Sequence, residues 1–141
     1  MENIEKIKDL LKQEDIDVEN IKKSFEVVKT EEISHGHKIS KFEGDFPTFI
    51  EPVYIGENVT IGDDVMLGPN VYIGNGVTIK DYVEISNSII YDDCLIGEDL
   101  FLENCIVGEE SMLNFKNTRL KNTILIGSGE NISNLKTKSL D

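Results

Sequence analysis

The chain has 141 residues, of which 29% are charged, and its formal net charge at pH 7 is −13. This charge excludes a surface built to bind nucleic acid or anionic lipid, because the phosphate groups would be repelled. The length suits one domain with a hydrophobic core. The start, MENIEKIKDLLKQ, lacks the apolar run of a secretory signal, and no later stretch is apolar enough to cross a bilayer. We therefore predict a cytoplasmic protein.

The N-terminal segment carries two apolar stripes at helical spacing, separated by an acidic break at residues 13–17. The two stripes consist of Ile4, Ile7, Leu10 and Leu11, and of Val18, Ile21, Phe25 and Val28. We expect residues 1–48 to form a helical cap and lead-in that closes the lower end of the domain that follows.

Beyond residue 48 the apolar residues recur every six positions. The first row consists of Phe49, Ile55, Ile61, Leu67, Ile73, Ile79 and Ile85, and a second row lies four residues after each of these. Six is a multiple of the two-residue period of a strand and not of the 3.6-residue period of a helix. Glycine and asparagine recur between the rows, where tight corners are expected. The pattern predicts short strands separated by regular corners.

A longer period is superposed on the six-residue one. The sequence VYIG at 53–56 returns at 71–74, eighteen residues later, which is three six-residue repeats and one coil of a triangular solenoid. We predict an all-β solenoid of about five coils over residues 49–133, followed by a polar, frayed tail at 134–141. The later repeats NSII, NCIV and NTIL predict one inward-facing column of side chains, which consists of Val53, Val71, Ile89, Ile106 and Ile124.

The six-residue motifs resemble those of the hexapeptide-repeat transferases. The clearest are IGENVT at 55–60 and IGDDVM at 61–66. This resemblance implies a left-handed parallel β-helix, which in that family usually assembles as a homotrimer.

A narrower resemblance points to the C-terminal solenoid of sugar-1-phosphate nucleotidylyltransferases. It is carried by EPVYIGENVTIG at 51–62, LGPNVY at 67–72 and ISNSIIYD at 85–92. Those proteins have an upstream catalytic domain, which this chain is too short to hold, so the resemblance implies a solenoid standing alone. The favoured hypothesis is an oligomerising module, accessory or structural in sugar-nucleotide metabolism, without a cofactor. A separately encoded nucleotidylyltransferase domain is a candidate partner.

The alternative hypothesis is an acyltransferase that uses acetyl-CoA on a sugar or sugar phosphate. Some related solenoids do this with a histidine base shortly after an Asn-Ser-Ile-Ile motif, but the matching stretch here has Glu98 in place of the histidine and Phe101 in place of a tyrosine. The pKa of an ordinary glutamate lies about two units below that of histidine. His35 and His37, the only histidines, precede the solenoid and are the other weak candidates for a base.

Three further patterns have a structural and a functional interpretation. The two histidines fall short of the three or four ligands of a zinc site, so no metal is predicted. Asp63, Asp81 and Asp99 are spaced by eighteen residues and could form a carboxylate row, although solvated corner residues are the simpler interpretation. Tyr54 and Tyr72 follow inward valines and should face outward, which makes them candidates for the homotrimer interface.

Overall fold

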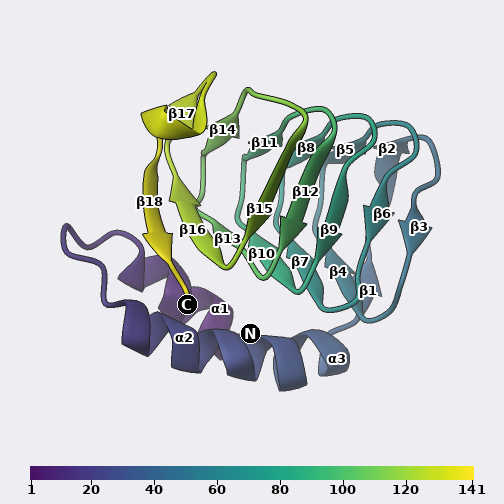
Figure 1. Cartoon of the computed structure of the whole chain (residues 1–141). Coiled ribbons are helices and arrows are strands. Elements are labelled where there is room, and N and C mark those ends of the chain that lie inside the picture. Colours follow the sequence, from purple (N-terminus) through teal and green to yellow (C-terminus); the bar gives the residue numbers. More distant parts are fainter.

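The computed structural model describes residues 1–141, most of which form a three-sided prism of parallel strands (Figure 1). Sheet A consists of β1 (Lys38–Ile39), β4 (Val53–Ile55), β7 (Val71–Ile73), β10 (Ser88–Ile90), β13 (Ile106–Val107), β16 (Thr123–Ile126) and β18 (Lys136–Ser139). Sheet B consists of β2 (Phe42–Gly44), β5 (Val59–Ile61), β8 (Thr78–Ile79), β11 (Leu95–Ile96), β14 (Met112–Leu113) and β17 (Ser128–Gly129). Sheet C consists of β3 (Thr48–Phe49), β6 (Met66–Leu67), β9 (Glu84–Ser86), β12 (Leu100–Glu103) and β15 (Thr118–Lys121).

Each complete coil contributes one strand to each sheet, in the order A, B, C. In Figure 1 the chain rises behind through sheet B and descends in front through sheet C while it advances from right to left, so the winding is left-handed. The predicted β-solenoid of about five coils is therefore confirmed. The solenoid was predicted to begin at residue 49, but it begins with β1 at Lys38, because β1, β2 and β3 already form a complete coil.

The interior of the prism is one stack of aliphatic side chains. A cluster of 23 buried residues fills it, and Ile55, Ile73 and Leu67 are fully buried. Corner residues such as Asn58 (φ 58°) and Asn70 (φ 59°) adopt the left-handed backbone conformation, which asparagine tolerates better than most residues. The recurring asparagines thus turn the chain between strands that are only two to four residues long.

The predicted inward column is correct for its first two members and wrong for the other three. In the register, Ser88 pairs with Val71, whereas Ile89 pairs with the outward-facing Tyr72. One residue is missing at the corner before β10, and a shift of one residue moves every side chain of a strand to the opposite face. Ile89, Ile106 and Ile124 therefore lie on the outer face of sheet A and belong to a second apolar cluster.

Ser88 takes the inward position that Ile89 was expected to hold. Its hydroxyl donates to the carbonyl oxygen of Ser86 (2.7 Å) and accepts from the backbone N–H of Cys105 (3.0 Å). These two bonds satisfy the hydroxyl, which is fully buried, so a polar side chain fits the core at this corner.

The N-terminal helices cover the outer face of sheet A. The helices are α1 (Glu2–Leu10), α2 (Val18–Val27), a π-helical turn η1 (Val28–Glu32) and α3 (Ile33–His35). Their buried residues, such as Ile7 and Ile21, form one cluster with Ile89, Ile106 and Ile124. The helical segment is as predicted, but it lies along a side of the prism and does not close its end (Figure 1). The reason is the outward row of isoleucines, an apolar face that has to be covered.

The C-terminal tail is ordered and was wrongly expected to be frayed. After a short 3-10 turn, η2 (Ile132–Asn134), β18 returns antiparallel to β16. Leu135 and Leu140 are buried, one against the prism core and the other against the helix cluster. These two leucines anchor an otherwise polar segment over the last coil.

None of the helices of the chain is long and apolar enough to span a membrane.

Replacement of Ile73 by aspartate should destabilise the fold by about 3–5 kcal/mol, because it leaves an unpaired charge in the closed stack. The matched control is Met112→Asp, at an exposed outward position of β14 whose neighbours Leu95 and Ser128 are uncharged, and it should leave the free energy of unfolding within about 0.5 kcal/mol of the parent. Urea unfolding followed by circular dichroism measures both variants. An Ile73→Asp variant as stable as the parent would contradict the inward placement of this residue.

Candidate functional site

The structure does not bring the predicted catalytic candidates together. His35 ends α3 and is exposed, and His37 lies just before β1 in the first coil. Glu98 is exposed at the corner between β11 and β12 in the fourth coil. His37 lies at the start of sheet A, directly before β1, whereas Glu98 lies at a corner between sheets B and C. The two side chains therefore occupy different corners and different coils.

His37 is held by two hydrogen bonds. Its Nδ1 accepts from the backbone N–H of Val53 (3.1 Å), and its Nε2 lies 3.1 Å from a carboxylate oxygen of Glu51. An Nδ1 that accepts a hydrogen bond leaves the proton on Nε2, which donates to Glu51. Both ring nitrogens are therefore engaged in fastening the lead-in to the start of β4, and His37 would have to give up one of these bonds to act as a base.

Tyr54 and Tyr72 lie on the outer face of sheet A, as predicted. Their rings stack with centroids 4.7 Å apart and planes 9° apart. Tyr72 also packs against the cluster formed with the helices, and this burial raises the pKa of its hydroxyl well above its ordinary value. Contact with the helices of the same chain takes up part of the surface that was predicted to meet another subunit, and a role of the two tyrosines in a trimer stays a prediction.

The acidic row differs from the predicted one by one member. The strand register places Asp63, Asp81, Glu98 and Lys116 above one another, whereas Asp99 aligns with Tyr82. The missing residue before β10 again shifts the later coils by one. The carboxylate of Asp81 accepts a hydrogen bond from the backbone N–H of Asp63 (2.8 Å). The Asp81 side chain therefore stabilises the corner of the preceding coil, which contains Asp63. No group of three or more His, Cys, Asp or Glu side chains is placed to hold a metal ion.

The outer face of sheet C carries an aromatic and cationic pair. Met66, Glu84, Phe101 and Arg119 form one outward column, and we call these four residues together with Tyr82 the sheet C face. The guanidinium carbon of Arg119 lies 4.7 Å from the centre of the Phe101 ring, within the range of a cation–π interaction.

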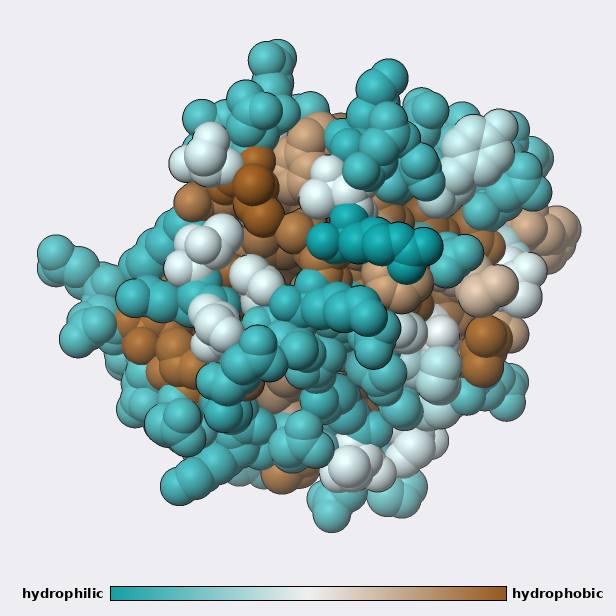
Figure 2. Space-filling model, in the orientation of Figure 1, coloured by the Kyte–Doolittle hydropathy of each residue, from teal (hydrophilic) through white to brown (hydrophobic).

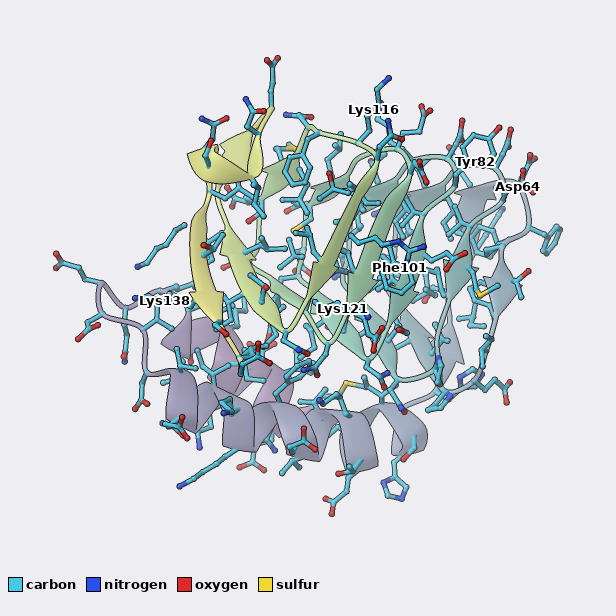
Figure 3. All side chains as sticks on the ribbon, viewed as in Figure 1. Asp64, Tyr82, Phe101, Lys116, Lys121 and Lys138 are labelled. Atoms are coloured by element: carbon cyan, nitrogen blue, oxygen red, sulfur yellow. The ribbon has the colours of Figure 1, made fainter.

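The sheet C face is exposed and slightly hollowed. Figure 3 shows Phe101 in the middle of the face and Tyr82 near its upper edge, and Tyr82 is 52% exposed to solvent. A hollow of about 330 Å³ lies between these two residues and Arg119. Figure 2 shows apolar side chains exposed between polar ones on this side of the molecule. No helix covers it, in contrast to sheet A.

The sheet C face was not predicted from the sequence, although a signal was present. Phe101 and Arg119 are eighteen residues apart, and each precedes an inward leucine, Leu102 or Leu120. Strict alternation along a strand turns both residues outward and places them side by side on neighbouring coils.

Comparison with known proteins gives one family match. The family model described as "GMPPB C-terminal domain" matches residues 49–135. A search of curated proteins found no match. Among solved structures, a hexapeptide-repeat containing acetyltransferase from Vibrio cholerae aligns over 94% of this chain and 98% of its own, at 16% identity. The TM-score of this alignment is 0.36.

The corner formed by Asp45 and Asp63 predicts a dependence of stability on pH. Hydrogen bonding to Asp45 and repulsion between the two carboxylates raise the pKa of Asp63 to about 6. The unfolded value is about 3.9, so the native state binds this proton more tightly. The stabilisation from this group is therefore complete below about pH 4 and is lost as the pH rises to about 6.

The variant Asp45→Asn should bring the pKa of Asp63 back toward its ordinary value, as measured by NMR titration of the side-chain carboxyl carbon. Asp15→Asn, in the loop between α1 and α2, is the control and should leave the titration unchanged. If the Asp45→Asn variant titrates like the parent, the two carboxylates do not share a proton.

Proposed function

Because the chain belongs to the GMPPB C-terminal domain family, a β-helix module of the sugar nucleotidylyltransferase type, we propose that it is an oligomerising module with an accessory or structural role in sugar-nucleotide metabolism. A nucleotidylyltransferase catalytic domain is the partner that such a module would serve. The observation that carries the proposal is the sheet C face, an uncovered side of the prism with the residue types of a subunit contact.

The three sides of the prism differ in how much partner surface they offer. The helices of the chain cover sheet A. The outward column of sheet B has no aromatic residue and no arginine, and it consists of Glu43, Thr60, Thr78, Leu95, Met112 and Ser128. The sheet C face presents methionine, tyrosine, phenylalanine and arginine, which are enriched at protein interfaces. Of the three sides, sheet C is therefore the best suited to bind another subunit.

The sheet C face is also rigid before any partner arrives. Phe101 and Arg119 project from adjacent strands, β12 and β15, which pair along four residues. Their contact already restricts both side chains, so less conformational entropy is lost on association. We expect three prisms to pack side by side around a threefold axis, each through its sheet C face. In such a ring each chain contacts its two neighbours through different parts of this face, and the ring closes so that no contact surface is left without a partner.

Substitution of Arg119 by glutamate should dissociate the threefold assembly, because it removes the cation–π pair and reverses the charge at the centre of the face. We expect the number of chains per particle to fall by a factor of three, measured by light scattering against the chain mass of 15.9 kDa. Lys23→Glu, an equal charge change at an exposed position of α2, is the control and should leave the mass unchanged. An unchanged mass for Arg119→Glu would rule out the sheet C face as the contact.

Acyl transfer from acetyl-CoA is a second candidate function, and the observation that favours it is the oriented His37–Glu51 pair. A histidine paired with a carboxylate is the arrangement of many general bases. Calorimetric titration of acetyl-CoA into the protein, at a concentration where the particle mass is known, separates the two candidates. Under the proposed function no saturable heat is expected. Saturable binding at about one site per chain, together with acetyl transfer to an amino sugar phosphate that is lost in His37→Gln and kept in Glu98→Gln, would replace the oligomerising role with acyl transfer.

A further inference from the structure

One corner between sheets B and C is made by an unusual residue. The strand register aligns four corner residues of successive coils, all in the left-handed backbone conformation: Asp64 (φ 53°), Tyr82 (φ 61°), Asp99 (φ 54°) and Asn117 (φ 55°). Aspartate and asparagine tolerate this conformation, whereas a bulky aromatic residue in it is an outlier. Such outliers cluster at binding sites. The turn itself does not explain why a tyrosine stands at residue 82.

The Tyr82 side chain is not used to build the fold. Half of it is exposed, and its ring stacks on no other aromatic ring of the chain. In contrast, Tyr54 and Tyr72 stack on each other on sheet A, and Phe101 carries Arg119. Both faces of the Tyr82 ring therefore lack an aromatic partner within the chain.

The hollow on the sheet C face is lined by polar side chains without partners. Its volume is about 330 Å³. Five of its lining residues are Tyr82, Glu84, Asp99, Asn117 and Arg119. The side chains of these five form no hydrogen bond and no ion pair within the chain. At other corners, Asn75 and Asp81 each accept a backbone N–H of the preceding coil at 2.8 Å.

The unpartnered groups match a ligand that carries several hydroxyls. The carboxylates of Glu84 and Asp99 accept hydrogen bonds and cannot donate them. The guanidinium of Arg119 only donates, and the amide of Asn117 does both. A hydroxyl group donates and accepts, so a polyhydroxylated molecule can bond to all of these groups. An apolar ligand would displace their water without replacing its hydrogen bonds.

The size of the hollow and the Tyr82 ring favour a single sugar ring. A volume of about 330 Å³ lies at the lower end of the range of roughly 300–1,000 Å³ for ligand sites. A nucleotide or coenzyme would extend well outside it. A pyranose ring presents C–H groups on a face and hydroxyls around its edge. The apolar face of Tyr82 can cover the C–H groups while the hydroxyls bond to the polar side chains.

The charge of the lining favours an uncharged sugar over a sugar phosphate. Glu84 and Asp99 contribute two negative charges, against one positive charge from Arg119. Both carboxylates repel a phosphate group, and the guanidinium of Arg119 already lies on the Phe101 ring. The ligand class that suits the hollow is therefore a neutral hexose.

We propose that the sheet C hollow binds an uncharged hexopyranose, with the C–H face of the sugar on Tyr82. The site needs one chain only and goes beyond the oligomerising role. One consequence rests on the proposed function, because the hollow lies on the surface that we assigned to the subunit contact. A bound sugar and a neighbouring chain compete for Tyr82 and Arg119, so the sugar favours single chains by mass action.

The methyl glycosides of glucose, mannose and galactose are the probes, and the 1-phosphate of the sugar that binds is the charged comparison. Ligand-observed NMR measures binding to the parent over a protein dilution series, and light scattering gives the particle mass of the same samples. At least one glycoside should bind saturably, with a dissociation constant in the millimolar range because the site is shallow. The 1-phosphate should bind at least about tenfold more weakly.

Tyr82→Asn separates a role in binding from a role in the fold. Asparagine suits this corner, so the variant should be at least as stable as the parent in urea, while sugar binding weakens at least about tenfold. Asp99→Asn should weaken binding about tenfold, because a charged acceptor is lost. The matched control is Asp64→Asn, at the same corner position outside the hollow, and it should bind the sugar like the parent.

The proposal is overturned if no glycoside binds saturably at any protein concentration, or if Tyr82→Asn and Asp99→Asn both bind like the parent. A Tyr82→Asn variant that is less stable than the parent would also overturn it, since the tyrosine would then serve the fold. The subunit contact is judged separately. Sugar binding at unchanged particle mass would mean that the sheet C contact is wrong and the sugar site holds. A mass that falls in Arg119→Glu, without sugar binding to the parent, would mean the reverse.

Discussion

The structure depends on the alternation of side chains between the inside and the outside of very short strands. Each coil buries its inward side chains against those of the next, so the interior is a single stack about one side chain wide at every level. Since a strand here has only two to four residues, a shift of one residue at a corner changes the face of the whole strand.

One such shift, before β10, accounts for the position of the helices. It turns Ile89, Ile106 and Ile124 outward on sheet A and makes this side of the prism apolar. The amphipathic N-terminal helices then have a surface on which to bury their own isoleucines, and the hydroxyl of Tyr91 donates a hydrogen bond to the carbonyl oxygen of Ile4 (2.7 Å) across the contact. Helices and solenoid share one apolar cluster there, so the two parts should unfold together.

The cover on sheet A determines which surfaces remain for other molecules. A bare prism would offer three sides and two ends, but the helices occupy one side and β18 with Leu135 closes one end. What remains includes the sheet C face, where Arg119 stacks on Phe101, and the first coil, where Phe46 is almost fully exposed.

The sequence by itself determined the solenoid, its triangular coils and its corners, because the six-residue period and the recurring asparagines are local properties of the chain. Only the tertiary structure decided which side chains point into the prism after residue 87. In NSII two isoleucines are adjacent, so an apolar pattern is satisfied whether Ile89 or Ile90 points inward, and the hydrogen bonds of Ser88 settle the choice. The place of the helices follows from this choice, because it depends on contacts between residues far apart in the chain, which no local pattern specifies.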